Sequence, residues 1–272
     1  MINNKLEILK QNIRDLGKVA VAFSGGVDST FLLRVSHDVL EENVIAISSY
    51  SGLFPKREGD FCKGFCEGEG IEHIALEYDA MSNPAFISNP KDRCYVCKTN
   101  LMSTMKVKAL ELGCDVLIEG SNADDIQDYR PGMKALDELG IISPLKEAGL
   151  TKSEIRTLSK EMGLPTWDMP SFACLATRFV YGESITEEKL RMVEDAEQYL
   201  YDQGFLQFRV RIHESGVGEA VSFLARVEVA EEDLPKLFEK RAEIHSELCK
   251  LGFSYVAMDM KGYRTGSMNV NI

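Results

Sequence analysis

Apolar residues along the first two thirds of the chain fall into two alternating patterns. Short continuous runs, rich in β-branched residues, predict buried strands at 19–23, 44–48, 71–76 and 115–119. Between them, apolar residues recur at helical spacing, which predicts helices over 1–17, 28–39, 55–70 and 98–112. Strands that alternate with helices are typical of an α/β fold with a doubly wound parallel sheet, in which a ligand binds at the carboxyl ends of the strands.

The remainder of the chain follows a different order. Thr151 and Glu154 form a capping box that opens a helix ending near Met162, and a less regular stretch follows. The pattern then predicts a helix at 186–200, strands at 207–212 and 221–229, a helix at 232–251 and a strand at 255–260. This order indicates a smaller α+β lobe on an antiparallel sheet. We therefore expect two domains, 1–180 and 181–272.

The first predicted strand ends in the motif Ser24-Gly25-Gly26-Val27-Asp28-Ser29, and the helical pattern begins at once. Two adjacent glycines allow positive φ and a close approach of the backbone to a ligand, and the amides of the first helical turn favour an anion. The motif lacks the Gly-Lys-Ser/Thr of a P-loop and is no Gly-x-Gly-x-x-Gly, which weakens kinase and dinucleotide-binding interpretations. It predicts a loop for a phosphate chain, with a tight turn in an unrelated α/β protein as the alternative.

An acidic turn follows the fourth predicted strand. It reads Glu119-Gly-Ser-Asn-Ala-Asp-Asp125 and precedes the sequence Asp128-Tyr-Arg-Pro-Gly132. Magnesium takes carboxylate and phosphate oxygens together, so such a turn beside a phosphate chain suits Mg²⁺. Its position at the expected ligand edge favours Asn122 and Asp124 as nucleotide-site residues, whereas a solvated loop is the alternative.

Composition narrows the range of partners. The 272 residues are 44% hydrophobic and carry a net charge of −12, from 43 acidic and 31 basic residues. Nucleic-acid affinity rests on phosphate neutralisation, so this balance argues against a nucleic-acid partner and allows a small anionic substrate held by a local arginine pocket. No run is long enough to span a bilayer and no signal peptide is evident, so we expect a soluble, cytoplasmic protein with no membrane partner. An acidic chain with a small sheet lobe also fits a homo-oligomer.

Cys174 is the first candidate for chemistry. It lies in Pro170-Ser-Phe-Ala-Cys-Leu, where Ser171 is placed to cap a short helix with Cys174 in its first turn and Arg178 one turn further on. A helix N-terminus and a nearby cation both lower a thiol pKa, which suits a catalytic nucleophile or a metal ligand. Cys174 and Arg178 are therefore the candidate catalytic residues. From spacing alone, a packed and inert cysteine is an equally good interpretation.

A second cysteine motif is Cys94-Tyr-Val-Cys97, in a predicted loop ahead of a helix. One pair is too few for a four-ligand zinc site, but three thiolates suffice for a [4Fe–4S] cluster with one open iron. Cys94, Cys97 and Cys174 are then the natural set of ligands, if their loops meet at the carboxyl edge of the sheet.

In a cytosolic chain the seven cysteines are better interpreted as thiols, metal ligands or a nucleophile than as disulfides. The other four are weaker candidates for chemistry. Cys62 and Cys66, four apart in a predicted helix, are rival metal ligands or simply one helix face. Cys114 and Cys249 lie beside apolar runs and are expected in the core.

Arg209 and Arg211 are two apart on a predicted strand, so their side chains share one face of the sheet. Arg226 and Glu228 have the same relation on the expected partner strand. Paired guanidiniums on a sheet face can bind a phosphate bidentately, although a solvent-facing side with a cross-strand ion pair is the better interpretation of the spacing alone. The preceding helix carries two acidic residues that are ambiguous in the same way, Glu194 and Glu197.

In combination these motifs resemble a known family. Ser-Gly-Gly-Val-Asp-Ser is similar to the pyrophosphate loop of the ATP pyrophosphatases, which cut ATP between the α and β phosphates. The chain also carries, in order, Ser121-Asn-Ala-Asp-Asp125, Asp128-Tyr-Arg-Pro-Gly132, Ala173-Cys-Leu-Ala-Thr-Arg178, Arg209-Val-Arg211 and Gly262-Tyr-Arg-Thr-Gly-Ser-Met-Asn269. Over essentially its full length it resembles the LarE family of ATP-dependent sulfur transferases, which act in assembly of the nickel-pincer nucleotide of lactate racemase.

The resemblance implies a two-step reaction. ATP adenylates a carboxylate of pyridinium biscarboxylic acid mononucleotide and pyrophosphate leaves; sulfur then replaces AMP and gives a thiocarboxylate. The first group of implied contacts holds ATP and Mg²⁺ through Ser24, Gly25, Gly26, Asp28, Ser29, Asn122 and Asp124. The second group holds the substrate and its phosphate through Arg209, Arg211 and Glu197.

Members of this family differ in their sulfur source. In one type, the cysteine matching Cys174 attacks the acyl-adenylate, loses its own sulfur by β-elimination and ends as dehydroalanine. In the other, cysteines matching Cys94, Cys97 and Cys174 hold a [4Fe–4S] cluster whose open iron carries an extra sulfide. This chain has all three, which favours the cluster type. The alternatives are a tRNA thiolation enzyme, an amide-forming ATP pyrophosphatase and a non-catalytic nucleotide-binding module.

Overall fold

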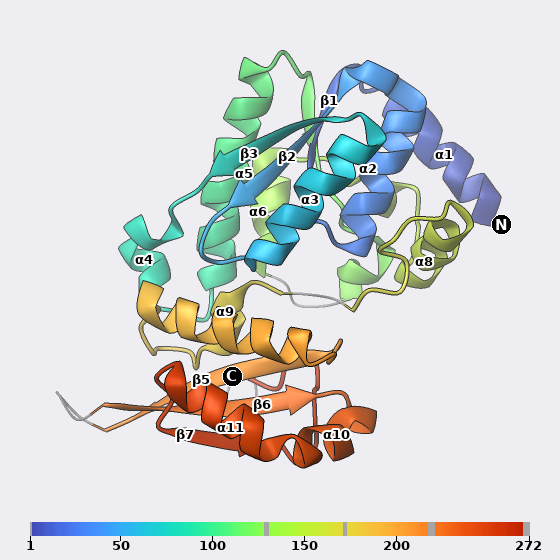
Figure 1. Ribbon diagram of the computed structural model, residues 1–272. Coiled ribbons are helices and arrows are strands. Elements are labelled where there is room, and N and C mark those ends of the chain that lie inside the picture. Colours follow the sequence, from blue (N-terminus) through green and yellow to red (C-terminus); the bar gives the residue numbers. More distant parts are fainter. Residues whose placement is uncertain (1, 128–130, 171–172, 217–220, 269–272) are drawn as a thin grey trace. The chain divides into compact units, whose positions relative to one another are not determined.

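The computed structural model describes residues 2–127, 131–170, 173–216 and 221–268 and divides the chain into two compact units (Figure 1). Unit 1 comprises Met1–Tyr78 with Asp92–Phe172, and unit 2 comprises Asp79–Lys91 with Ala173–Ile272. The predicted domain boundary after residue 180 stays a prediction. No helix in the described ranges is both long and apolar enough to cross a membrane.

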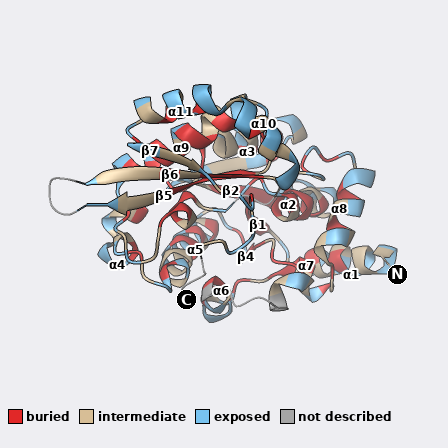
Figure 2. Cartoon of the chain, turned by 90° about the horizontal axis from the view of Figure 1, so that it is seen from below, coloured by how far each residue is buried: buried red, intermediate tan, exposed pale blue. Residues whose placement is uncertain are grey.

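Unit 1 contains a four-stranded parallel sheet, which confirms the fold class that the alternating pattern predicts. The strands are β1 (Val19–Ala22), β2 (Val44–Tyr50), β3 (Glu72–Glu77) and β4 (Val116–Ile118), in the order β3-β2-β1-β4. The central strand β1 is buried along its whole length (Figure 2). Because β2 and β4 lie on opposite sides of β1, the winding reverses there, and ligands of such sheets bind at the carboxyl side of that reversal.

Helices cover both faces of this sheet. One face packs against α1 (Ile2–Arg14), α2 (Val27–Leu40), α3 (Lys56–Glu69) and α8 (Lys152–Glu161), and the other against α5 (Arg93–Glu111) and α6 (Pro131–Leu139). Strand β1 alternates accordingly, since Val19, Val21 and Phe23 enter the first core whereas Ala20 and Ala22 enter the second. Three short elements complete the unit: η1 (Glu41–Asn43), η3 (Ala123–Gln127) and α7 (Pro144–Glu147).

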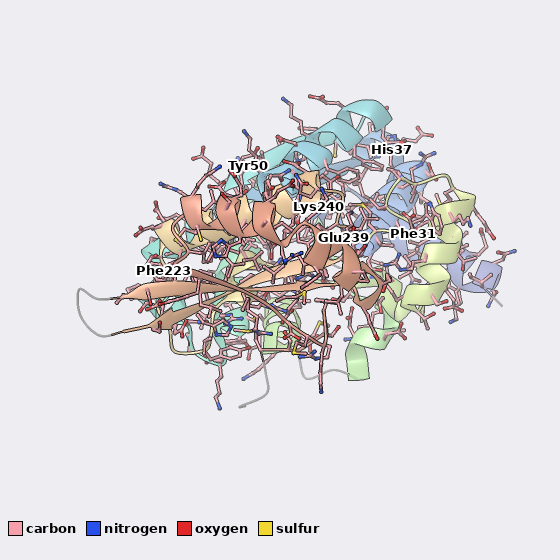
Figure 3. All side chains as sticks on the ribbon, turned by 60° about the horizontal axis from the view of Figure 1, so that its bottom comes forward. Phe31, His37, Tyr50, Phe223, Glu239 and Lys240 are labelled. Carbon is pink, nitrogen blue, oxygen red and sulfur yellow. The ribbon has the colours of Figure 1, made fainter. Side chains whose placement is uncertain are left out.

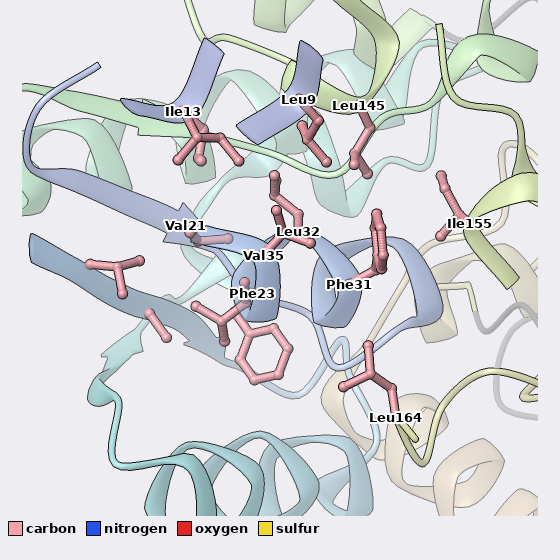
Figure 4. Close-up of a cluster of buried hydrophobic side chains, with 14 of the residues drawn as sticks. Leu9, Ile13, Val21, Phe23, Phe31, Leu32, Val35, Leu145, Ile155 and Leu164 are labelled. Atoms are coloured by element: carbon pink, nitrogen blue, oxygen red, sulfur yellow. The ribbon is translucent and has the colours of Figure 1, made fainter. Parts of the chain in front are cut away.

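In the first core, α1 and α8 pack against α2, the helix that follows the phosphate loop (Figure 4). Leu9 and Ile13 of α1 pack with Phe31 and Leu32 of α2, all fully buried. The predicted capping box of α8 is present, because Thr151 and Glu154 each bind the other's backbone N–H. Glu154 also pairs with Lys5 at 2.7 Å, which ties α1 to the start of α8.

Unit 2 is built on a three-stranded sheet. Its strands are β5 (Phe208–Ser215), β6 (Ser222–Val229) and β7 (Tyr255–Met258), in the order β5-β6-β7. The helices are α4 (Pro84–Ile87), α9 (Glu187–Asp202), α10 (Leu234–Glu239) and α11 (Arg241–Lys250), with the 3-10 helices η2 (Ala80–Ser82), η4 (Leu175–Arg178) and η5 (Glu231–Asp233). The α+β class of this lobe is confirmed.

Two details of the predicted lobe are wrong. Strands β5 and β6 are antiparallel, but β6 and β7 are parallel, so the sheet is mixed. The helices between β6 and β7 form a crossover, and a crossover connection returns the next strand in the same direction. The single predicted helix over 232–251 is also interrupted, since α10 ends at Glu239 and Lys240 leaves the helical conformation before α11 (Figure 3).

Residues 79–91 belong to unit 2, and the buried side chain of Asn89 helps to hold them there. Asn89 Nδ2 donates to the carbonyl oxygens of Val180 (2.6 Å) and Glu183 (3.1 Å). Its own carbonyl accepts from Gly182 N at 3.0 Å. Asn89 has a φ of 52°, a left-handed conformation that asparagine tolerates better than most residues. This segment is therefore held to residues 180–183.

Candidate functional site

The predicted phosphate loop connects β1 to α2. Gly25 has a φ of +73°, which favours glycine, and a Cβ on it would crowd Cys62 Sγ at 3.1 Å. Ser29 Oγ donates to the carbonyl of Gly26 at 3.2 Å and accepts from the backbone N–H of Ser24 at 3.3 Å. The turn is therefore held in shape by its own serines.

The N-terminus of α2 is open toward an anion. Gly26 is the N-cap residue and offers no side chain to accept hydrogen bonds from the first-turn amides. By contrast, the first turn of α8 is bound by its capping box. The partial positive charge at the start of α2 is thus available to a phosphate, as the motif predicts.

The acidic turn after β4 lies directly against this loop, which confirms the predicted juxtaposition. A Cβ on Gly120 would lie 3.0 Å from the backbone N of Ser29 and 3.2 Å from the carbonyl carbon of Asp28. Only glycine fits there without a backbone shift. Glu119 is buried and accepts from the backbone N–H of Ser121 at 3.0 Å, which holds the turn against β4. The binding roles of the turn residues stay predictions.

Lys152, which sequence reasoning missed, joins the loop to the acidic turn. Its Nζ pairs with Asp28 Oδ2 at 2.5 Å, and its backbone N–H donates to Asp124 Oδ2 at 2.8 Å. Asn122 Oδ1 accepts from the backbone N–H of Asp124 at 2.9 Å. The local sequence at Lys152 indicates only the capping box of α8. It does not reveal the pairing with Asp28, which is 124 positions away in the chain.

The environment of Asp28 suits a cation shared with a ligand. Burial raises the pKa of its carboxyl, while the charge and hydrogen bond of Lys152 oppose that rise, and Asp125 adds to it. Asp28 Oδ1 is buried and accepts no hydrogen bond within the described part of the chain. Asp28, Asn122 and Asp124 are oxygen donors that fit Mg²⁺. Within the described ranges no three His, Cys, Asp or Glu side chains are arranged to hold a metal by themselves, so such an ion would also need phosphate oxygens.

An apolar pocket adjoins the loop at the carboxyl ends of β1 and β2. It is lined by Ala22, Phe23, Ser24, Ser48, Ser49, Phe54, Glu58, Gly59, Cys62, Leu101, Met102 and Met105. Aromatic and methionine side chains beside a phosphate site suit a planar heteroaromatic ring such as a nucleobase. Ser48 Oγ donates to the carbonyl of Phe23 at 2.9 Å and is bonded to His73 Nε2 at 3.0 Å, which fixes the wall between the two strands.

In unit 2, Cys174 is the N-cap residue of η4 rather than a first-turn residue. Its carbonyl accepts from the backbone N–H of Thr177 at 3.0 Å, which starts the short helix. The predicted cap, Ser171, lies outside the described residues. Cys174 is half-buried, whereas Leu175 and Ala176 after it are buried. Its thiol is therefore better placed for chemistry than a cysteine inside a core.

Arg178 holds the backbone around Cys174. Its guanidinium is fully buried and donates to the carbonyl oxygens of Ala173 (2.7 Å) and Cys174 (3.2 Å). It also donates from Nε and Nη2 to the two carboxylate oxygens of Glu197, each at 2.8 Å. Glu197 Oε1 further accepts from the backbone N–H of Val210 at 2.9 Å. The pair thus connects η4, α9 and β5.

This geometry supports positioning roles for Arg178 and Glu197. Burial by itself raises the pKa of Glu197, but the charge and hydrogen bonds of Arg178 outweigh it and keep that pKa below its usual value. Both oxygens of Glu197 already accept bonds within unit 2, and the side chain is 0% exposed. The predicted catalytic role of Arg178 and the predicted substrate contact of Glu197 stay predictions.

Arg209 and Arg211 share one face of β5, with Glu228 and Arg226 opposite them on β6, as the spacing predicts. Only 2% and 5% of the two arginines are exposed, so the solvent-facing interpretation is wrong. Arg211 Nη2 donates diagonally to Glu228 Oε2 at 2.9 Å. Burial, with the nearby charge of Arg178, lowers the pKa of Arg209 to about 10. This is the electrostatic character of an anion site.

Cys94 and Cys97 lie near the start of α5 and not in a loop before it. The buried apolar face of this helix starts only at Leu101, so the apolar periodicity predicted a helix start that is too late in the sequence. Their spacing places both thiols on one side of the helix. Cys94 is exposed, and burial raises the pKa of Cys97 to about 11. Because Cys174 belongs to unit 2, the set of three cysteines stays a prediction.

The remaining cysteines favour packing over chemistry. Cys62 and Cys66 are buried in the first core, and burial raises the pKa of each thiol to about 12. Cys114 is buried as expected. Cys249 is only half-buried, so its predicted core position is wrong; the buried side of α11 is formed by other residues, such as Leu248.

A parallel strand, a glycine turn, an uncapped helix N-terminus, an acidic turn and an apolar pocket at one sheet edge define a nucleotide-binding α/β protein of the PP-loop type. No family model matches the chain. An uncharacterized protein of Synechocystis sp. is 40% identical over 99% of this chain and 98% of its own length.

Two further relatives have named activities. The pyridinium-3,5-bisthiocarboxylic acid mononucleotide synthase of Lactiplantibacillus plantarum is 34% identical over 94% of this chain and 91% of its own length. A glutamine-hydrolyzing GMP synthase component of Thermoplasma volcanium is 28% identical over 68% of this chain and 64% of its own length. The chain therefore belongs to the LarE family, which includes the L. plantarum synthase, within the PP-loop ATP pyrophosphatase superfamily.

Proposed function

We propose that this protein is an ATP-dependent sulfur transferase that adenylates a carboxylate of pyridinium biscarboxylic acid mononucleotide and converts it to a thiocarboxylate. The L. plantarum relative is named for the corresponding pyridinium-3,5-bisthiocarboxylic acid mononucleotide. Adenylation is needed because a carboxylate has no good leaving group, whereas an acyl-adenylate can expel AMP when a sulfur nucleophile attacks.

A surplus of positive charge in unit 2 carries this proposal. Among the described residues, four buried or half-buried guanidiniums and three carboxylates meet in one network, namely Arg178, Arg209, Arg211 and Arg226 with Glu197, Glu228 and Asp259. Burying charge without a counter-charge is costly. A phosphate monoester carries about −1.5 to −2 charges at pH 7, so it would compensate this surplus. A mononucleotide substrate supplies such a group.

The residues of unit 1 account for the ATP-dependent half of the reaction. The amides of the Ser24–Ser29 turn would receive the β and γ phosphates, and the apolar pocket would take the adenine ring. Asp28 and Asp124 would hold Mg²⁺, which supplies charge neutralisation for the departing pyrophosphate. A carboxylate oxygen of the substrate attacks the α phosphorus, the bond between the α phosphorus and the bridging oxygen breaks, and pyrophosphate leaves.

The residues of unit 2 account for the second half. Arg209 and Arg211 hold the substrate phosphate, and Arg178 fixes the backbone of Cys174. In the sacrificial route, the Cys174 thiolate displaces AMP from the acyl carbon. Removal of the Cys174 Cα proton then breaks the Cβ–S bond, which leaves a thiocarboxylate on the substrate and dehydroalanine in the chain.

The cluster route uses the same acyl-adenylate with a different sulfur donor. Cys94, Cys97 and Cys174 would hold a [4Fe–4S] cluster, which supplies sulfide from its open iron. The donor chemistry suits such a cluster, because Cys94 and Cys97 offer two soft ligands from one side of α5 and Cys174 offers a half-buried third thiol. The presence of this pair favours the cluster route.

The reaction is tested by pyrophosphate release from ATP in the presence of synthetic pyridinium-3,5-dicarboxylic acid mononucleotide. We expect release that depends on this acceptor and a product in which one oxygen is replaced by sulfur, seen by mass spectrometry. Release without the acceptor, or a product that incorporates ammonia, would contradict the proposal. The latter would favour the alternative of an amide-forming ATP pyrophosphatase.

The sulfur source is tested on protein purified without oxygen. We expect iron and acid-labile sulfide in about equal amounts, lost in Cys94→Ala and Cys97→Ala but retained in the matched surface variant Ser246→Ala. Iron-free protein whose intact mass falls by that of hydrogen sulfide after one turnover would instead establish sacrifice of Cys174.

A further inference from the structure

Two adjacent serines near the carboxyl end of β2 lie on opposite faces of the unit 1 sheet. Ser48 lies on the face covered by α3, where its hydroxyl donates to the carbonyl of Phe23 at 2.9 Å and is bonded to His73 Nε2 at 3.0 Å. Ser49 lies on the other face, because side chains alternate along a strand and Ile47, two positions earlier, packs in the second core. Both serines line the apolar pocket beside the phosphate loop.

The side-chain oxygen of Ser49 is buried and has no hydrogen-bond partner within the described part of the chain. The wall of the pocket on this face is apolar, with Leu101, Met102 and Met105 of α5. An unpaired buried hydroxyl destabilises a folded protein, and an alanine would fill the same position without that penalty. A ligand that enters the pocket and bonds to Ser49 accounts for a hydroxyl at this position.

The surroundings of Ser49 restrict the chemistry of that ligand. The pocket adjoins the glycine turn, whose amides favour a phosphate chain, and its apolar walls suit a planar ring. A hydroxyl both accepts and donates a hydrogen bond. Adenine offers a donor, its 6-amino group, next to an acceptor, a ring nitrogen, so its edge can satisfy both capacities of one hydroxyl.

We propose that Ser49 Oγ accepts a hydrogen bond from the 6-amino group of ATP and thereby favours adenine over a purine that carries hydrogen at this position. The inference rests on the proposed function for the use of ATP. It assigns recognition of the base to a side chain of β2, outside the phosphate loop, and makes Ser49 a specificity-determining residue.

The binding test removes the hydroxyl from the protein and the amino group from the ligand, separately and together. Calorimetric titration compares a non-hydrolysable ATP analogue with the matching analogue of purine riboside triphosphate, which has hydrogen in place of the 6-amino group. We expect Ser49→Ala to weaken binding of the ATP analogue about fivefold to tenfold, as for the loss of one hydrogen bond. The purine analogue should bind Ser49→Ala at least as tightly as wild type. Ser246→Ala, at an exposed position of α11, is the matched control.

Thermal unfolding without ligand gives a second readout. Because the Ser49 hydroxyl has no partner among the described residues, Ser49→Ala should unfold at a temperature no lower than wild type. Ser48→Ala removes the bond from β2 to the carbonyl of Phe23, so it should unfold at a lower temperature and weaken both analogues alike. A serine with only a structural role at position 49 would behave like Ser48.

The outcomes separate failure of this inference from failure of the proposed reaction. If Ser49→Ala binds the ATP analogue like wild type, or loses both analogues equally, the inference is overturned whether or not sulfur transfer occurs. A wild-type protein without preference for the ATP analogue also overturns it. If that preference depends on Ser49 but pyridinium-3,5-dicarboxylic acid mononucleotide gives no sulfur-containing product, the reaction fails and the inference stands.

Discussion

Arg178 and Glu197 form a two-point ion pair inside unit 2, with both N–O distances at 2.8 Å and neither side chain exposed. A planar guanidinium and a planar carboxylate match each other at two atoms, which fixes their relative orientation. The remaining N–H groups of Arg178 hold the carbonyls of Ala173 and Cys174. The pair therefore fixes the backbone of the candidate nucleophile relative to α9 and β5.

Breaking this pair should destabilise unit 2 strongly. Glu197→Gln leaves the Arg178 charge buried without compensation, and we expect the free energy of unfolding to fall by about 3–5 kcal/mol. Urea denaturation followed by circular dichroism measures it. The control is Glu187→Gln, which removes an exposed pair with Arg191 on the same helix and should leave the unfolding midpoint unchanged. Equal midpoints for the two variants would contradict the positioning role.

Acid should remove the same stabilisation. Arg178 holds the folded-state pKa of Glu197 below its usual value of 4.5. A lowered carboxyl pKa contributes stability that is present above the unfolded-state value and is lost as the pH falls through the folded-state value. We therefore expect the advantage of wild type over Glu197→Gln to be complete at pH 7 and to shrink below the usual carboxyl range. An advantage that grows on acidification would show that the sign of the shift is wrong.

Gly120→Ala should impair nucleotide binding without unfolding the protein. The new methyl group would lie 3.0 Å from the backbone of Ser29, so either the acidic turn or the first turn of α2 must move. We expect ATP affinity to fall at least about tenfold by calorimetry, or 1.4 kcal/mol. Gly68→Ala is the matched control, because a Cβ at that exposed position meets nothing within 4 Å. Normal ATP affinity in Gly120→Ala would contradict a role of the acidic turn in shaping the phosphate loop.

Lys152→Met should move the pH dependence of pyrophosphate release. Burial raises the pKa of Asp28, and Lys152 is the main group that opposes the rise. Without it the carboxyl stays protonated to higher pH, so the acidic limb of the pH profile should shift upward. We also expect activity near neutral pH to fall about tenfold or more, as for the loss of a charged hydrogen bond. Lys63→Met, an exposed change on α3, should leave the profile unchanged.

Thiol reactivity should separate the cysteines into two groups. In the metal-free native protein, iodoacetamide at pH 8 should label Cys94 first, because it is exposed. Burial raises the pKa of Cys62 and Cys66 to about 12, so the thiolate fraction at pH 8 is on the order of one in ten thousand. Mass spectrometry should find these two labelled only after unfolding. Rapid native labelling of Cys62 would contradict its place in the core.

Much of the fold could be predicted because its signals are local. Buried parallel strands are continuous apolar runs, so β1 and its neighbours were recognisable from the sequence, as was the capping box at Thr151. The direction of β7 could not be predicted in this way, since it depends on how α10 and α11 return the chain. The start of α5 was also missed, because the buried apolar positions of this helix begin only at Leu101.

Local sequence alone accounts for the α/β class, the glycine turn at Gly25 and the shared face of Arg209 and Arg211, because strand and helix periods and glycine conformations are properties of neighbouring residues. The packed structure was needed to show which of these residues are buried and what they meet. The pairing of Lys152 with Asp28, the fit of Gly120 against α2 and the hydrogen bond from Asn89 to Val180 join positions far apart in the chain. Such contacts arise only when the core packs, and no local pattern of residues encodes them.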